Sequence, residues 1–210
     1  MLDQAPRRYA FSVKEWHLMG EAGLFDEDSR VELIDGEVFQ MAAIGHPHFV
    51  CVNRLNRLLV MAVGGRAVVS VQNPVQLDDY SEPQPDLAVL DPAMDDYDGV
   101  NPLAKDVYLL VEVADTTLNW DIGFKTPRYA RAGIPACWVV GLNAGEVVVH
   151  VDPGPDGYRS VHRAQPGEVL EVESLPGVEV SVAEVLGPVR QSPPAGRDDE
   201  GAGSDQKEEP

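Results

Sequence analysis

The 210-residue chain has few basic residues, and this shortage limits the partners that it can hold. Sixteen Lys and Arg stand against 35 Asp and Glu, which gives a net charge of −19 with neutral histidines. Residues 188–210 contain six acids and three basic residues, or −3 of this charge, so −16 belongs to residues 1–187. Such a chain lacks the broad basic surface that attracts nucleic acid without sequence preference. A local basic groove remains compatible with this charge, and so does a site that concentrates divalent cations.

Other absences exclude further classes of protein. No hydrophobic run approaches the length of a membrane span. The first residues lack the basic and apolar regions of a secretory signal, so we expect a cytoplasmic protein without a membrane partner. The two cysteines, Cys51 and Cys137, stand in apolar surroundings without a pairing or metal-binding pattern, and we expect reduced core residues. Walker loops, dinucleotide fingerprints and serine-centred nucleophile elbows are also missing.

Hydrophobic periodicity predicts an α/β or α+β fold, a mixed β-sheet flanked by helices. The order along the chain is helix, hairpin, helix, strands, helix, strands, with additional hairpin strands toward the C-terminus. We predict helices at 13–22, 46–63, 121–132 and 182–186, a hairpin at 30–41, and strands at 66–71, 86–90, 107–113, 136–140, 146–151, 158–163 and 169–172, with 74–77 extending one strand or forming another. Residues 1–187 would form one domain. Residues 188–210, rich in Pro, Gly and acids, would form a disordered tail.

Local signals support several of these elements. Ser12 followed by Glu15 is a capping-box pattern, and the helix that it opens would turn Trp16 and Met19 inward. Asp35-Gly36 between alternating strands is a strong hairpin signal. Pro127 either begins a shorter helix capped by the preceding Thr126 or kinks a longer one.

Two acids in core strands are the main evidence for function. The run from Val107 to Val113 is apolar or aromatic except for Glu112, and it reads as a strand buried on both faces. The apolar strand ending at Leu90 begins with Asp86. An ionised carboxylate belongs in such a place only when it is paired or coordinated.

These acids, with Lys125 downstream, match the needs of metal-dependent phosphodiester cleavage. Carboxylates hold Mg²⁺ or Mn²⁺ through hard oxygen ligands, and Asp86 and Glu112 supply them. The metal activates water and offsets the charge that develops on the phosphate. Lys125 supplies a cation for the attacking hydroxide and the phosphate oxygens. The backbone carbonyl of Val113, beside Glu112, is a natural extra ligand.

Each of these charged residues also has a purely structural explanation. Asp86 alone can cap a turn, and Glu112 can form a buried ion pair with Lys125 or Arg128. Lys125 on a helix face is usually solvated, and Asp121 one turn earlier offers an ordinary i,i+4 pair.

Other candidate residues are equally open to two readings. Tyr129 and Trp138 are core residues or substrate contacts. His46 and His48 begin a helix, and without a ligand pattern they are weak evidence for a transition metal. Glu32 alternates with apolar neighbours, so it faces either solvent or the site.

The sequence also resembles a known family. Gln84-Pro-Asp86 followed by Glu112-Val-Ala114 resembles the PD-(D/E)xK signature of restriction-endonuclease-like phosphodiesterases, although Ala114 stands where that signature has lysine. In one branch the lysine lies on the following helix. This chain has Glu112-Val-Ala-Asp-Thr-Thr-Leu-Asn-Trp-Asp121, then Lys125, Tyr129-Ala130, Gly133-Ile-Pro135 and Trp138. The pattern is similar to the Uma-type family of bacterial restriction endonucleases, over about residues 10–165.

The resemblance implies a restriction-endonuclease-like core, dependence on Mg²⁺ or Mn²⁺, and DNA as substrate. By position, it makes Asp86 and Glu112 metal ligands and Lys125 the catalytic cation. It places Glu32 and His48 near the site, and we expect Gln84, Asp121 and Tyr129 to support it, since they belong to the matching pattern.

Two hypotheses compete with a Mg²⁺-dependent endonuclease of DNA. One is a catalytically inactive module that keeps the nuclease fold and binds nucleic acid or protein. Its basic contacts would come from a strip formed by Arg54, Arg57, Lys125, Arg128 and Arg131. The other is a structural subunit, for which the apolar strands after Ala136 would supply a homodimer interface.

Overall fold

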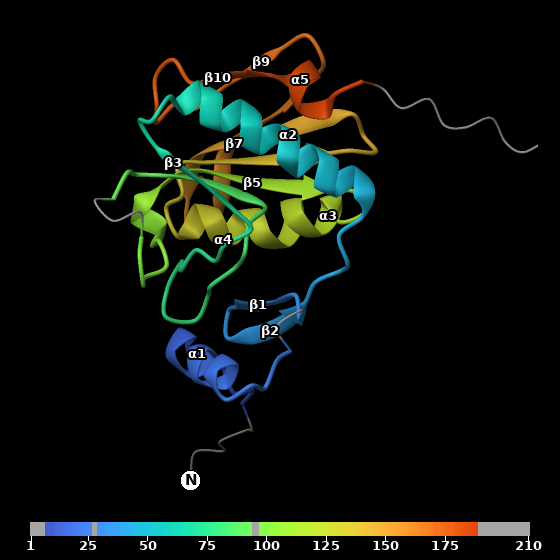
Figure 1. Ribbon diagram of the computed structural model, residues 1–210. Coiled ribbons are helices and arrows are strands. Elements are labelled where there is room, and N and C mark those ends of the chain that lie inside the picture. Colours follow the sequence, from blue (N-terminus) through green and yellow to red (C-terminus); the bar gives the residue numbers. More distant parts are fainter. Residues whose placement is uncertain (1–6, 27–28, 94–96, 189–210) are drawn as a thin grey trace, which may run out of the picture.

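A six-stranded mixed sheet forms the centre of the computed structural model, which describes residues 7–26, 29–93 and 97–188 (Figure 1). Its strands lie in the order β3-β4-β5-β6-β7-β8, and every neighbouring pair is antiparallel except β5 and β6. The strands are β3 (Val68–Val71), β4 (Leu87–Leu90), β5 (Val107–Ala114), β6 (Ala136–Gly141), β7 (Glu146–Gly154) and β8 (Gly157–Ala164). This architecture confirms the predicted mixed sheet, including the hairpin strands after β6.

Helices cover both faces of the sheet (Figure 1). One face carries α2 (His46–Val63), α5 (Val182–Leu186) and the small antiparallel pair β9 (Val169–Glu171) and β10 (Glu179–Ser181). The other face carries a broken helix made of α3 (Leu118–Trp120), a π-helical turn η2 (Asp121–Lys125) and α4 (Thr126–Arg131). A short 3₁₀ turn, η1 (Ala104–Asp106), leads into β5. No helix among the described residues combines the length and apolar character that crossing a membrane requires.

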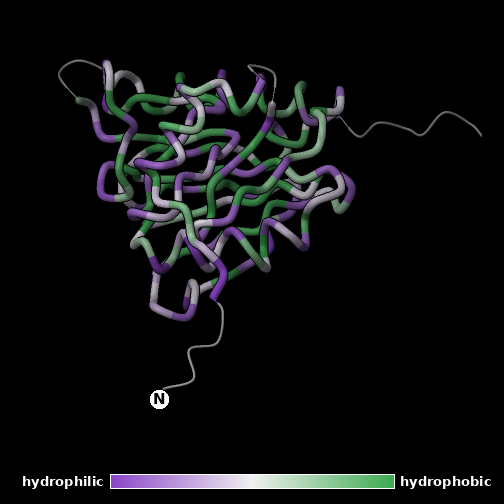
Figure 2. Tube along the Cα trace, turned by 90° about the horizontal axis from the view of Figure 1, so that it is seen from below, coloured by the Kyte–Doolittle hydropathy of each residue, from purple (hydrophilic) through white to green (hydrophobic). Residues whose placement is uncertain are grey.

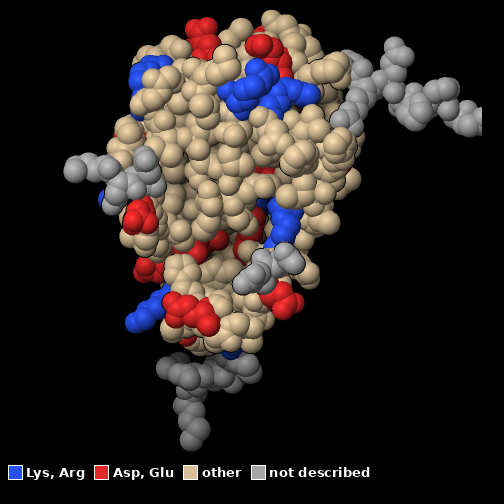
Figure 3. Space-filling view, in the orientation of Figure 1, with Lys and Arg blue, Asp and Glu red and all other residues tan. Residues whose placement is uncertain are grey.

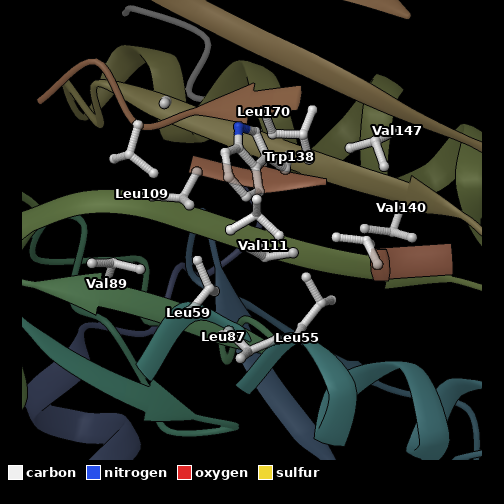
Figure 4. Packing of buried hydrophobic residues seen from close by; sticks show 14 of the residues in the cluster. Leu55, Leu59, Leu87, Val89, Leu109, Val111, Trp138, Val140, Val147 and Leu170 are labelled. Atoms are coloured by element: carbon white, nitrogen blue, oxygen red, sulfur yellow. The ribbon is translucent and has the colours of Figure 1, made fainter. Parts of the chain in front are cut away.

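Alternate residues of the central strands enter two separate cores. Leu87 of β4 and Val111 of β5 pack toward Leu55 and Leu59 of α2, with Trp138 fully buried beside them (Figure 4). Their sequence neighbours, such as Ala88 and Leu110, belong to the cluster that includes Tyr129 of α4. Each fully buried Val or Leu side chain contributes about 1.5–3 kcal/mol. Hydrophobic residues accordingly run through the interior of the trace, and hydrophilic ones lie mainly at its turns (Figure 2).

Helix α1 (Val13–Glu21) and the hairpin of β1 (Val31–Ile34) and β2 (Glu37–Gln40) lie beyond the α4 side of the sheet (Figure 1). The predicted capping box is present, since Ser12 and Glu15 exchange side-chain and backbone hydrogen bonds. The hairpin turns at Asp35 and Gly36, which have φ of 50° and 76°. Positive φ at both central residues is the type I′ turn that Asp-Gly favours. A Cβ on Gly36 would also lie 2.5 Å from the Cβ of Ala10, so this position requires glycine.

The structure corrects several local predictions. Residues 74–77 form no strand; within the described chain, Gln76 makes only an isolated bridge to Leu103. Helical structure begins at Leu118 and continues through Pro127, because the π turn accommodates the missing N–H donor. The Thr126 hydroxyl donates to the carbonyl of Ile122 instead of capping a new helix.

Two further differences concern α1 and the strands near the C-terminus. Trp16 and Met19 are only partly buried, and Val13 is the buried residue of α1. The short strand β10 was not predicted. The predicted tail lies outside the described residues beyond Pro188.

Candidate active site

Asp86 and Glu112 lie on the same face of the sheet. Leu87 of β4 pairs with Val111 of β5 in an antiparallel ladder. One step further along this register, Asp86 comes opposite Glu112. Because side chains alternate across a strand, both acids share the face of Ala88 and Leu110, toward α4. The two carboxylates therefore meet at the end of β4, where the ladder stops.

Three donors fix the Asp86 carboxylate. His48 Nε2 lies 2.9 Å from Oδ2, the Val113 N–H donates to Oδ2 at 2.8 Å, and Gln72 Nε2 donates to Oδ1 at 3.2 Å. Val113 therefore turns its N–H toward the β4 side of β5. In an antiparallel ladder the N–H and C=O of one residue point the same way, so its carbonyl faces that side as well. The carbonyl therefore faces the end of β4, and its role as a metal ligand stays a prediction.

Glu112 is 3% exposed and has two buried partners. Lys125 Nζ donates to its Oε1 at 3.2 Å, and the Tyr129 hydroxyl donates to the same oxygen at 2.5 Å. Lys125 Nζ also donates to Oε1 of Glu32 at 3.1 Å, which links the β1–β2 hairpin to β5. Glu32 therefore faces the site and not solvent. Tyr129 was expected to be either a core residue or a contact of the site. Its ring is buried in the core, and its hydroxyl contacts Glu112.

The π turn η2 brings two charged residues inward. Both Asp121 and Lys125 are buried, at 3% and 2% exposed. The Thr117 hydroxyl donates to Asp121 Oδ2 at 2.7 Å, and the expected i,i+4 pair between Asp121 and Lys125 is not among the described ion pairs. The expectation of a solvated lysine is also wrong, because the two glutamates draw its ammonium into the protein.

These groups line a cleft of about 160 Å³ between the sheet and the hairpin. Figure 3 shows acidic side chains in a hollow between the main body and the lower part of the molecule. The lining includes four buried carboxyl residues and one buried lysine. They are Glu32, Asp86, Glu112, Asp121 and Lys125, and the lining also includes His48, Gln84, Val113, Arg30 and Asp115. The cleft therefore carries an excess of buried negative charge.

Different surroundings separate the pKa values of the two acids. The pKa of Glu112 is raised to about 8, because burial, together with the neighbouring carboxylates, outweighs the opposing effect of Lys125. Burial also raises the pKa of Asp121. For Asp86, burial acts in the same direction, but the contacts to His48 and the Val113 N–H outweigh it and lower the pKa. The pKa of Lys125 is raised, because its carboxylate partners, Glu112 first, outweigh the opposing effect of burial.

The carboxylate and carbonyl oxygens around the cleft fit a divalent cation. Oε2 of Glu32 is buried and finds no hydrogen-bond partner among the described residues. Carboxylate and carbonyl oxygens are the ligands that Mg²⁺ prefers, and this ion usually keeps several waters beside one or two carboxylates. Within the described chain no three His, Cys, Asp or Glu side chains form a complete metal cluster, so water would have to fill the remaining coordination positions.

Two supporting residues were not predicted from the sequence. Gln72 has a φ of 52°, unusual for a residue other than glycine. Its N–H donates to the Asp86 carbonyl at 3.0 Å, and its carbonyl accepts from Gln84 Nε2. Thr117 could have been found from its place four residues before Asp121.

The predicted basic strip does not form. Lys125 is buried, Arg54 donates to the carbonyls of Val185 and Leu186, and Arg128 pairs with Asp35. Cys51 and Cys137 are buried free thiols, as predicted.

Comparisons with known proteins agree with this architecture. No curated protein matches the chain. A solved structure, a putative nuclease belonging to DUF820 from Anabaena variabilis ATCC 29413, is similar with a TM-score of 0.65 and 13% identity, covering 79% of this chain and 94% of that one. At this identity the likeness concerns the fold. The model of the family described as "Uma2: Putative restriction endonuclease" matches residues 15–183. With most of its length matched, the chain belongs to the Uma2 family of restriction-endonuclease-like proteins, which confirms the resemblance found in its sequence.

Proposed function

We propose that this protein is a Mg²⁺- or Mn²⁺-dependent nuclease that hydrolyses phosphodiester bonds of DNA. One observation carries the proposal. Asp86 and Glu112, from neighbouring strands, open on one cleft beside the buried ammonium of Lys125. The description of the family supports nucleic acid as the class of substrate, and the carboxylate and carbonyl oxygens of the cleft support a divalent metal.

Asp86, Glu112 and the Val113 carbonyl would hold the ion. A divalent ion in such a place lowers the pKa of bound water and polarises phosphoryl oxygens. His48 and Gln72 orient the Asp86 carboxylate from both of its oxygens. Tyr129 orients Glu112 in the same way.

Lys125 has a donor left for the reaction. An ammonium has three N–H donors, and two of them go to Glu32 and Glu112 in the described structure. The third can bind a phosphate oxygen or the attacking water, since Lys125 lines the cleft. A fixed cation at this point stabilises the charge that develops in the transition state.

Cleavage of supercoiled plasmid DNA with Mg²⁺ or Mn²⁺ tests the proposal. Wild-type protein should nick or linearise the plasmid, and EDTA, Asp86→Asn and Glu112→Gln should each abolish the reaction. Glu146→Gln is the matched control, because Glu146 is also buried but pairs with Arg163 outside the cleft. Cleavage that survives Glu112→Gln would contradict the proposal.

A catalytically silent binding module is the second candidate. The ion pairs of Lys125 with Glu32 and Glu112 favour it, because they already neutralise part of the cleft. This candidate predicts no Mn²⁺ binding by calorimetry and no cleavage, so the two functions give opposite results in the same samples.

A further inference from the structure

A second cavity adjoins the catalytic cleft and is not used by the proposed chemistry. It has a volume of about 490 Å³ and lies between α1 and the chain that enters β1. Trp16, His17, Gly20, Phe25, Glu82 and Gln84 are among the residues that line it. Gln84 lines the catalytic cleft as well, so this one residue borders both spaces.

One wall of this cavity is aromatic. The rings of Trp16 and Phe25 lie 4.8 Å apart between centroids at 46°, and both are only partly buried. Aromatic side chains that line an open space can stack with a flat ring.

A polar wall faces the same space. Glu82 is 4% exposed, and its two oxygens contact His17 at 2.7 Å and Asn101 at 2.9 Å. A carboxylate has about four acceptor positions, so Glu82 can accept further hydrogen bonds from the edge of a ligand. A stacking surface with an adjacent buried acceptor matches a nucleobase, which offers a π-face and amino donors.

The position of the cavity fits one nucleotide beside the cleavage point. Gln84 precedes Asp86 by two residues, and two extended residues span about 7 Å at most. A phosphate bound at Asp86 would leave the base of an adjoining nucleotide within reach of the cavity. A further cavity of about 610 Å³ shares His17 and Glu21 with this one, and Lys14 lines it.

The charge of the protein supports recognition through bases. Residues 1–187 carry −16, and the predicted basic strip does not form, so the protein offers little basic surface for phosphate contacts. Stacking on aromatic side chains does not need a basic surface. We propose that the cavity lined by Trp16 and Phe25 binds an unpaired nucleobase of the substrate, next to the bond that is cleaved. The inference rests on the proposed nuclease function for the identity of the ligand.

The test measures binding of single-stranded DNA, separately from cleavage. The probe is a short oligonucleotide with one 2-aminopurine, whose fluorescence falls when the base stacks, compared with the same oligonucleotide carrying an abasic site there. Ca²⁺ replaces Mg²⁺, and electrophoresis verifies that the probe stays intact. Stacking of one base on an aromatic side chain corresponds to about 5- to 150-fold in affinity.

Two pairs of variants separate binding from folding. Trp16→Ala should bind the intact and the abasic oligonucleotide with equal affinity. Trp16→Phe should keep most of the preference for the intact one. Gly20 lies in α1, lines the cavity, and a Cβ there meets nothing within 4 Å. Gly20→Phe should therefore fill the cavity and abolish the fluorescence change, whereas Gly20→Ala, which favours the helix, should bind as wild type.

The expected result is a base-dependent affinity that Trp16→Ala and Gly20→Phe both remove. Equal affinity for the intact and abasic probes, or equal binding by Gly20→Phe and Gly20→Ala, would overturn the inference. Plasmid cleavage is measured in the same preparations. If cleavage is normal and the base effect is missing, only the base site fails; if base-dependent binding exists without any cleavage, only the nuclease proposal fails.

Discussion

Replacement of Lys125 by methionine should destabilise the protein strongly. The Lys125 ammonium lies 3.1 Å from Glu32 and 3.2 Å from Glu112, and all three residues are almost fully buried. Methionine keeps the length of the side chain and removes the charge. Loss of one partner from a buried ion pair costs about 3–5 kcal/mol, because the remaining charge is left uncompensated. For a domain of this size, that loss lowers Tm by about 6–20 °C.

The loss should depend on pH in a definite direction. The pKa of Glu112 is already raised to about 8, and removal of the ammonium raises it further. Above the unfolded pKa, near 4.5, the folded state then binds more protons than the unfolded state, so its stability falls as pH rises. Wild type shows the same dependence up to its own Glu112 pKa of about 8, so the destabilisation by Lys125→Met should be smallest below pH 8 and grow above it.

Urea unfolding at several pH values measures this effect, with Glu32→Gln and the double variant completing a cycle. We expect a coupling of about 0.5–3 kcal/mol between Lys125 and Glu32. Mg²⁺ should restore more stability to Lys125→Met than to wild type, since a bound cation takes over part of the missing charge. A loss below about 1 kcal/mol that does not vary with pH would refute the buried triad.

Three further predictions concern the acids of the cleft. Mn²⁺ binding should release a proton from Glu112 below pH 8, so affinity should rise by up to about tenfold per pH unit between pH 6 and 8, and calorimetry in buffers of different ionisation enthalpy measures the release. A pH-independent affinity would count against it. Gln72→Met removes a donor to Asp86 and should weaken Mn²⁺ binding about 10- to 100-fold at unchanged Tm, whereas a Tm loss without weaker binding would make Gln72 merely structural. Tyr129→Phe leaves Glu112 without its hydroxyl donor and should lower the free energy of unfolding in urea by about 1.5–3 kcal/mol. An unchanged free energy of unfolding would contradict this hydrogen bond.

The central strands could be predicted because their sequence carries the signal directly. Val107–Val113 is apolar on both sides of the strand, so its burial between two helical layers follows from composition. Glu112 stands out within this run for the same reason. The Asp-Gly turn and the capping box at Ser12 are local patterns whose geometry depends on few neighbours.

Contacts between distant elements could not be predicted in this way. Lys125 pairs with Glu32, 93 residues away, and not with Asp121 on its own helix. Sequence spacing favours the local pair, but the π turn and the buried charge of the hairpin decide the outcome. Gln72 was missed because its side chain reaches Asp86 from a backbone conformation with positive φ, which the sequence does not indicate.

Diffraction data from crystals soaked in Mn²⁺ test the central claim most directly. We predict one anomalous peak within about 2.0–2.6 Å of carboxylate oxygens of both Asp86 and Glu112, with the Lys125 ammonium beside it. A soaked crystal without such a peak, in which Glu112 keeps Lys125 and Tyr129 as its only partners, would contradict the account.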